Sequence, residues 1–246
     1  MKHLPAHAAK LPGAVASRFA HVDAWVFDLD NTLYPAGSDV WPKIDQRITL
    51  FMVELFGLDG ASSRALQKYY YERYGTTLRG LMSEHDVTAE EFLEFVHDID
   101  RSSLVPDHSL ARAIARLPGR KLILTNGSRE HALRTAERLG IDRLFEDVFD
   151  IVAADLLPKP HAETYEKFFL LHDVAPHRAA MFEDMAKNLL VPHARGMVTT
   201  LVTPKAGDAV AREEWELEPG RQPHIDFVAD DLTSFLEALA PDAQAR

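Results

Sequence analysis

Two carboxylates, Asp28 and Asp30, stand two residues apart at the end of the short apolar run AWVFDLD. Such a run is typical of a buried strand in a parallel sheet, which delivers the polar groups that follow it to one edge of the sheet. There one carboxylate could attack a phosphorus atom, and the other could protonate the leaving oxygen and later activate water. The alternative is a surface turn, because Asp and Asn also favour tight loops.

Thr125 and Asn126 follow a second apolar run, KLILT, and precede a glycine. A hydroxyl and backbone N–H groups at the start of a helix form a natural cradle for phosphate, since the helix dipole and its unpaired donors favour an anion. The alternative is that this segment only caps the helix that follows.

Lys159 stands between Pro158 and Pro160 in the segment LLPKPHAE. The prolines stiffen the backbone on either side, so the charge of the lysine would be aimed in a constant direction. Lysine binds phosphate as a point charge. Taken alone, however, an isolated lysine is ordinarily a solvated surface residue.

Two acids, Glu183 and Asp184, follow a third apolar run, AAMF. Carboxylates at a strand end suit a hard cation that prefers oxygen ligands, and we expect magnesium. Asp184 could also cap the next helix, and the two roles are compatible. The four polar groups follow separate strands in an order suited to phosphoryl transfer, and together they favour an enzyme over four unrelated local features.

The segments that must position these residues are one strand, then a long helical stretch, and then alternating strands and helices. Apolar residues recur at helical spacing from about residue 39 to 117, and strand–helix units follow, which imply a parallel sheet covered on both faces. We therefore predict an α/β fold, a Rossmann-like parallel sheet core (residues 1–36 and 118–246) with a helical cap (37–117) inserted after the first strand. The later predicted strands are Lys121–Thr125, Asp150–Ala154, Ala179–Phe182, Met197–Val202 and Ile225–Val228, with helices at about 162–172 and 232–239 and a loose tail over the first 22 residues.

The charge and composition of the chain limit its partners. It carries 27 Lys and Arg against 38 Asp and Glu, a formal net charge of -11, and no cysteine. Nucleic-acid binding usually needs a clustered basic face, so we expect a small phosphorylated metabolite rather than a nucleic-acid polymer. The lack of cysteine excludes disulfides and fits a cytoplasmic protein. No apolar run approaches the roughly 18 residues of a membrane span, and no secretory signal is expected.

The quoted segments also resemble a known family. VFDLDNTLY (26–34), LILTNG (122–127), KPHAETY (159–165) and MFEDMAKNL (181–189) are similar to the four motifs of the haloacid dehalogenase-like hydrolase superfamily. Their spacing resembles the subgroup with a helical cap between the first two motifs. The cap segment YGTTLRGLM (74–82), with His85 beyond it, resembles pyrimidine 5'-nucleotidase-type members.

The resemblance implies a role for each matching residue. Asp28 would be the nucleophile and a magnesium ligand, and Asp30 the general acid and base, with its backbone carbonyl on the metal. The remaining residues would act as follows: Thr125, Asn126 and Lys159 would bind phosphate, Asp184 and Glu183 would complete the metal site, and Asn188 would orient Asp184.

Arg79 is the cap residue that we expect to contact substrate, since its planar fork of donors could meet a base carbonyl or a ribose hydroxyl. Tyr74 and His85 are further candidates for the same wall. The alternative is that Arg79 pairs with a cap acid such as Glu84 or Asp86.

The sequence thus predicts a magnesium-dependent phosphomonoester hydrolase that acts through an aspartyl-phosphate on a pyrimidine nucleoside 5'-monophosphate. The alternatives are a phosphatase for phosphoglycolate or a sugar phosphate, a mutase, and a non-catalytic nucleotide-binding module. In dehalogenating relatives the position of Asp30 is not an acid, because halide leaves without a proton, so Asp30 favours ester hydrolysis. The sequence leaves the oligomeric state open.

Overall fold

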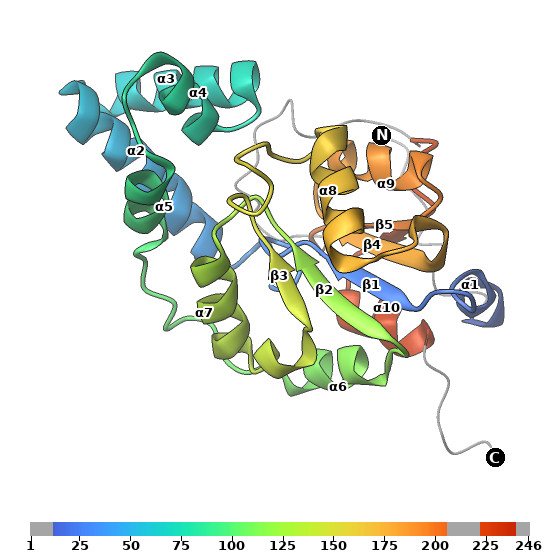
Figure 1. Cartoon of the computed structure of the whole chain (residues 1–246). Coiled ribbons are helices and arrows are strands. Elements are labelled where there is room, and N and C mark those ends of the chain that lie inside the picture. The colour runs from blue at the N-terminus through green and yellow to red at the C-terminus, as the bar shows by residue number, and fades with distance from the viewer. Residues whose placement is uncertain (1–11, 206–221, 240–246) are drawn as a thin grey trace, which may run out of the picture.

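The computed structural model describes residues 12–205 and 222–239. Within them six parallel strands form one sheet in the order β3-β2-β1-β4-β5-β6 (Figure 1). This confirms the predicted α/β fold with a Rossmann-like parallel sheet. The strands are β1 Ala24–Phe27, β2 Arg120–Leu124, β3 Asp147–Phe149, β4 Ala179–Glu183, β5 Val198–Val202 and β6 Phe227–Ala229.

Alternating residues of the strands pack on opposite faces of the sheet, as the two-residue period of a strand requires. In β1, Trp25 and Phe27 join one buried cluster, whereas Ala24 and Val26 join another. Both faces are therefore covered, and this explains why the strand is apolar throughout.

The helices of the core divide between the two faces. Buried residues of α6, α7 and α10 belong to the cluster around Trp25, and those of α8 to the cluster around Val26. Their bounds, with those of the short helices, are α1 Pro12–Arg18, α6 His108–Arg116, α7 Arg129–Leu139, α8 Ala162–His172, α9 Leu190–Ala194, α10 Leu232–Leu239, η2 Asp142–Leu144, η3 Pro176–Arg178 and η4 Ala186–Leu189.

Four helices after β1 form a separate group beside the carboxyl ends of the strands (Figure 1). Their apolar residues make a third buried cluster that includes Phe51, Tyr70 and Leu81. Side chains of Asp59, Thr76 and Thr88 accept hydrogen bonds from the first turns of α3, α4 and α5, which explains where these helices begin. The helices are α2 Val40–Phe56, α3 Gly60–Tyr74, α4 Thr77–Glu84 and α5 Ala89–His97.

We keep the division into core and cap as a proposal, with a change of boundary. Helix α6 lies within the predicted cap segment 37–117, but its Leu110 and Ile114 pack in the core cluster. We therefore propose that the cap ends after α5, near residue 100.

Two predictions for local structure were wrong. The apolar run Asp150–Ala154 is a turn rather than a strand, because both oxygens of Asp150 accept backbone N–H bonds, from Arg129 and Ala153, and the strand ends at Phe149. The first 22 residues are not wholly a loose tail, since α1 precedes a buried Phe19 whose ring stacks on Trp25 at 5.8 Å. Residues 1–11 lie outside the described part.

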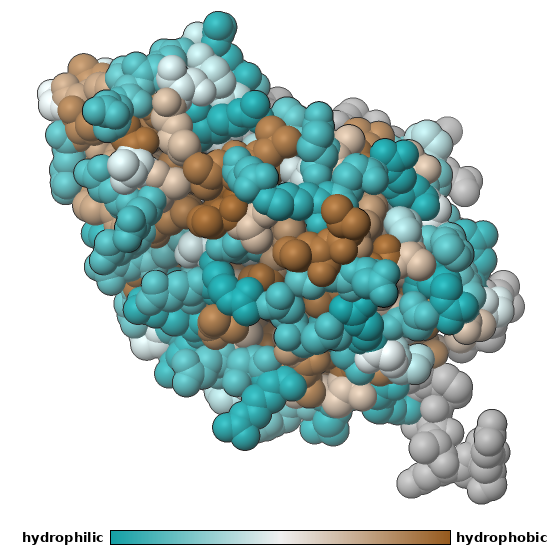
Figure 2. All heavy atoms as spheres, viewed as in Figure 1, coloured by the Kyte–Doolittle hydropathy of each residue, from teal (hydrophilic) through white to brown (hydrophobic). Residues whose placement is uncertain are grey.

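The surface seen in Figure 2 is mainly hydrophilic, with apolar residues gathered near the middle of this face. Over residues 12–205 and 222–239, no helix has both the length and the apolarity needed to cross a bilayer.

Gly80→Ala should destabilise the cap helices, because a Cβ at Gly80 would stand 2.6 Å from both Cβ and Cγ of the buried Tyr70. Overpacking of this kind lowers the free energy of unfolding by about 1–3 kcal/mol, measurable by urea titration. Gly60→Ala is the matched control, since nothing lies within 4 Å of its Cβ position. Equal stability of the two variants would contradict the observed packing of α4 on α3.

Candidate active site

The carboxyl ends of three neighbouring strands meet at the centre of the sheet. Strand β1 lies between β2 and β4, so Asp28 emerges between Thr125 and Asp184. The backbone N–H of Asp28 donates to the carbonyl of Phe182 at 2.9 Å, which extends the ladder to the edge of the sheet. In parallel α/β sheets this edge is where ligands bind.

Asp28 lies in a buried polar environment. Its Oδ1 accepts a hydrogen bond from Nζ of Lys159 at 2.6 Å, and its Oδ2 accepts one from Thr32 at 3.3 Å. Burial raises the pKa of the Asp28 carboxyl to about 7; the charge of Glu183 adds to this rise, and that of Lys159 opposes it. A second cation beside Asp28 would favour its ionised form.

Lys159 is a buried cation held between two carboxylates. Its Nζ donates to Asp28, to Oε2 of Glu183 at 2.7 Å and to the carbonyl of Leu124 at 2.9 Å. Burial alone would lower the pKa of Lys159, but Asp28 and Glu183 raise it above its usual value, so the ammonium form is the stable one. The solvated lysine considered as an alternative is not what the structure contains.

Asn126 fixes the backbone from which Lys159 projects. Its Oδ1 accepts from the backbone N–H of Lys159 at 2.8 Å, and its Nδ2 donates to the carbonyl of the same residue at 3.3 Å. Thr125 accepts from the N–H of Gly127 through its hydroxyl at 2.9 Å. A direct contact of either side chain with phosphate stays a prediction.

Three buried carboxylates, those of Asp28, Glu183 and Asp184, each offer an oxygen within 4.8 Å of the others. A set of oxygen donors of this kind suits a hard divalent cation such as Mg²⁺. Glu183 is engaged elsewhere as well, because its Oε1 accepts from the N–H of Met185 and its Oε2 from Lys159. Asn188 is buried nearby, but its Oδ1 has no partner among the described residues, so its predicted support of Asp184 stays untested.

Asp30 is held by two residues of the core. Its Oδ1 accepts a hydrogen bond from the hydroxyl of Tyr34 at 2.5 Å and lies 2.8 Å from Nε2 of His131. Burial alone would raise the pKa of Asp30, but its close contacts with His131 and with the hydroxyl of Tyr34 lower it to about 2. At neutral pH Asp30 is therefore a carboxylate in this arrangement, the form that accepts a proton.

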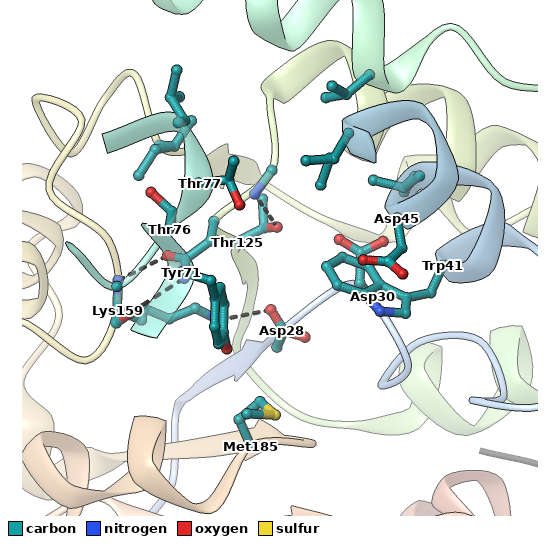
Figure 3. Close-up of a pocket in the computed structure, with 18 of the residues that line it drawn as sticks. Asp28, Asp30, Trp41, Asp45, Tyr71, Thr76, Thr77, Thr125, Lys159 and Met185 are labelled. Atoms are coloured by element: carbon teal, nitrogen blue, oxygen red, sulfur yellow. Dashed lines mark hydrogen bonds and ion pairs between the residues drawn. The ribbon is translucent and has the colours of Figure 1, made fainter. Parts of the chain in front are cut away.

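A cavity lies between these strand ends and the helical group, with Tyr71, Thr76 and Thr77 facing the core residues across it (Figure 3). The helical group contributes both polar and aromatic side chains. The residues of this group that line the cavity are Trp41, Ile44, Asp45, Ile48, Gln67, Lys68, Tyr71, Gly75, Thr76, Thr77, Leu78, Phe92, Leu93, Val96 and His97. Those of the core are Asp28, Asp30, Asn31, Thr125, Asn126, Gly127, Ile151, Lys159, Glu183, Asp184, Met185, Lys187 and Asn188.

The three predicted cap residues do not line this cavity. Arg79 donates from Nη1 to Nε2 of His161 at 3.0 Å, rather than to a cap acid. Tyr74 donates to Glu84 and His85 lies 2.7 Å from the hydroxyl of Tyr70. The spacing of apolar residues predicts a helix and its buried side, but which of its polar residues face the active site depends on how the helix packs in three dimensions.

Sequence reasoning missed several residues that border the site, among them Tyr34, Tyr71, His131 and Lys187. Tyr34 stands four residues after Asp30 in the same loop, and His131 three residues after Ser128, the N-cap of α7. Their places in the chain, soon after Asp30 and soon after the LILTNG segment, are the signal that could have drawn attention to them, but Glu130 of the same helical turn is exposed, so packing decides that His131 faces Asp30. Tyr69, Tyr70 and Tyr71 are consecutive in α3 and point in different directions, since Tyr70 is buried in the cap whereas Tyr71 lines the cavity.

Residues 22–190 match the haloacid dehalogenase-like hydrolase family. This is more than half of the chain, and the chain belongs to that family, as its four motifs led us to expect.

Among curated proteins, the chain is 27% identical over 175 residues to Phosphate metabolism protein 8 of Saccharomyces cerevisiae. That similarity covers 64% of this chain and 54% of the yeast protein, so the chain spans about half the length of this relative.

Solved structures with a similar fold include three proteins of different kinds. L-2-haloacid dehalogenase of Xanthobacter autotrophicus, with chloropropionic acid covalently bound, is 18% identical at a TM-score of 0.55, over 90% of this chain and 100% of that one. The HAD-hydrolase YfnB of Bacillus subtilis, bound to magnesium, is 13% identical with a TM-score of 0.56, and the similarity covers 89% of this chain and 98% of that one. CbbY of Rhodobacter sphaeroides, in complex with phosphate, is 16% identical with a TM-score of 0.57, and the similarity covers 85% of this chain and 94% of that one. At these identities the similarity shows the fold alone.

Proposed function

We propose that this protein is a magnesium-dependent phosphomonoester hydrolase that works through an aspartyl-phosphate on Asp28. The observation that carries the proposal is the group formed by Asp28, Lys159 and the acids at the end of β4, buried together at the carboxyl edge of the sheet and facing a cavity. A carboxylate can act as the nucleophile toward phosphorus, and a nearby cation offsets the repulsion between it and the phosphate.

In the proposed reaction an oxygen of Asp28 forms a bond to phosphorus while the bond from phosphorus to the ester oxygen breaks. Lys159 and the hydroxyl of Thr125 would hold the phosphate oxygens. Because Nζ of Lys159 already has three acceptors, equal to its number of donors, a phosphate oxygen would replace one of them.

Asp30 would protonate the departing oxygen and then accept a proton from the water that hydrolyses the aspartyl-phosphate. The nearby negative charge of a bound phosphate would raise the pKa of Asp30 from its low value in the free protein and so favour the protonated form. An acid at this position favours ester hydrolysis over dehalogenation, although dehalogenases share the fold.

Asp28, Asp184 and the backbone carbonyl of Asp30 would hold Mg²⁺, which supplies positive charge beside the reacting oxygens. The donor set fits such an ion, since three buried carboxylates meet there. The magnesium in the B. subtilis structure and the phosphate in the R. sphaeroides structure agree with this proposal. We propose that Glu183 mainly holds Lys159.

The proposed substrate is a pyrimidine nucleoside 5'-monophosphate. The support is the resemblance of residues 74–82 and a cavity wall in which the ring of Tyr71 faces the core residues (Figure 3). Such a ring can stack on the base of a nucleotide.

A panel of phosphate esters with Mg²⁺ present, ranked by kcat/KM, tests this function. We expect UMP and CMP to rank first. A tenfold preference for phosphoglycolate or a hexose phosphate would contradict the nucleotide assignment, whereas a lack of turnover with every ester would favour a non-catalytic binding module and contradict the phosphatase.

Tyr71→Ala should lower kcat/KM for UMP and CMP by about tenfold or more, since a lost stacking contact in a desolvated site is worth about 1–3 kcal/mol. Acetyl phosphate, which has neither base nor sugar, should be hydrolysed as before. Tyr69→Ala is the control, because Tyr69 is on the same helix but 46% exposed. Equal losses on the nucleotides and on acetyl phosphate would mean that Tyr71 only supports the structure.

A further inference from the structure

His131 is a fully buried histidine that joins the side chain of Asp30 to a buried arginine. Its Nε2 lies 2.8 Å from Oδ1 of Asp30, and its Nδ1 lies 2.8 Å from Nη2 of Arg101. Neither His131 nor Arg101 has a role in the proposed reaction as described above. Both are charged or polar groups that the fold has removed from water, and such groups need a specific compensation.

The arginine fixes which nitrogen of His131 carries the proton. A guanidinium group can only donate hydrogen bonds, so Nδ1 of His131 must be the acceptor in their contact. The ring is then neutral, with its proton on Nε2, and it donates to Oδ1 of Asp30. The hydroxyl of Tyr34 donates to the same oxygen at 2.5 Å.

Arg101 is itself firmly held. Its Nη1 and Nη2 donate to the carbonyls of Ile99 and His97, at 3.1 and 3.0 Å, and its Nε donates to Thr135 at 3.3 Å. The ring of His97 stacks on that of His131, with centroids 4.4 Å apart and planes 6° from parallel. These contacts leave the imidazole little freedom to rotate.

The consequence for Asp30 concerns which of its two oxygens meets the substrate. Oδ1 accepts hydrogen bonds from both Tyr34 and His131, so it faces the protein interior. Oδ2 lies on the side of Gly127, 3.7 Å from the position of a Cβ there, and Gly127 lines the cavity. A proton exchanged with substrate or water would therefore be carried by Oδ2.

We propose that His131, with its tautomer set by Arg101, is a positioning residue that turns Oδ2 of Asp30 toward the leaving group. This inference rests on the proposed phosphatase function. It assigns to a histidine outside the four motifs the task of holding the acid in its productive orientation, a task that general acid catalysis requires.

The kinetic test compares His131→Gln with His131→Asn, because the Gln amide can reach the position of Nε2 and the Asn amide cannot. The measured quantity is the rate of the phosphorylation step, for a nucleoside monophosphate with a poor leaving group and for nitrophenyl phosphate, which hardly needs a proton. We expect His131→Asn to lose at least about tenfold more on the nucleotide than on nitrophenyl phosphate, and His131→Gln to keep the wild-type ratio.

The physical test does not depend on activity. In the wild-type protein at neutral pH, ¹⁵N NMR of labelled histidine should show His131 as the neutral form with its proton on Nε2. A proton on Nδ1, or a doubly protonated ring, would overturn the inference whether or not the histidine variants fold. A wild-type protein inactive on all esters would instead contradict the proposed function, and with it any catalytic role of His131. Equal losses on both substrates in His131→Asn would overturn the positioning role while the phosphatase stands.

Discussion

Asp28→Asn should abolish turnover, with kcat lowered by at least about 10³-fold on every ester, because an amide oxygen cannot form the covalent intermediate. The fold should be retained. Asn has nearly the size of Asp, and Lys159 keeps Glu183 as a buried partner at 2.7 Å. Steady-state assays with UMP and nitrophenyl phosphate, together with circular dichroism and a melting curve, check both parts.

Asp23→Asn is the matched control for this substitution. Asp23 stands immediately before β1 and pairs with Arg178 at the surface, where exposed ion pairs contribute little. Its activity should equal that of the wild type. If Asp28→Asn kept more than a few per cent of wild-type activity, the covalent mechanism would be wrong.

Removal of divalent metal with a chelator should abolish activity, and Mg²⁺ should restore it. Asp184→Asn should raise the Mg²⁺ concentration for half-maximal activity by about tenfold or more, because it removes a charged oxygen ligand from the site. Calcium as the only metal should support little turnover, since it takes more oxygen ligands than magnesium and would draw in both oxygens of Asp28.

Asp155→Asn is the control for the metal experiment, because Asp155 is an exposed acid that pairs with Lys167. Its magnesium requirement should be unchanged. Full activity after exhaustive chelation, or strong activity with calcium alone, would contradict the proposed metal site.

The sequence was sufficient to predict which residues meet at the sheet edge. Asp28, Thr125 and Asp184 each follow an apolar run, and polar residues after parallel strands must come to one edge whatever the detailed packing. The order of strands put β1 between β2 and β4, so these three residues are neighbours. The helix Leu232–Leu239 was confirmed to the residue because its apolar residues recur at helical spacing.

The orientation of the cap could not be predicted in the same way. Arg79 lies in the predicted helical segment, yet its guanidinium turns to His161 of the core, while Tyr71 reaches the cavity. Helical periodicity gives a stripe of apolar residues, and three-dimensional packing decides which of the remaining sides faces the site. The same holds for His131, whose partners are distant in the sequence at Asp30 and Arg101.

The most direct test of the account is the identification of the phosphorylated residue. Protein reacting with UMP and Mg²⁺ would be quenched rapidly in acid and treated with borohydride, which reduces an aspartyl-phosphate to homoserine, and its peptides would be analysed by mass spectrometry. We predict homoserine at position 28, dependent on both UMP and Mg²⁺ and missing in Asp28→Asn. Reduction at another acid, or an unmodified Asp28 in protein that turns over UMP at full rate, would contradict the account.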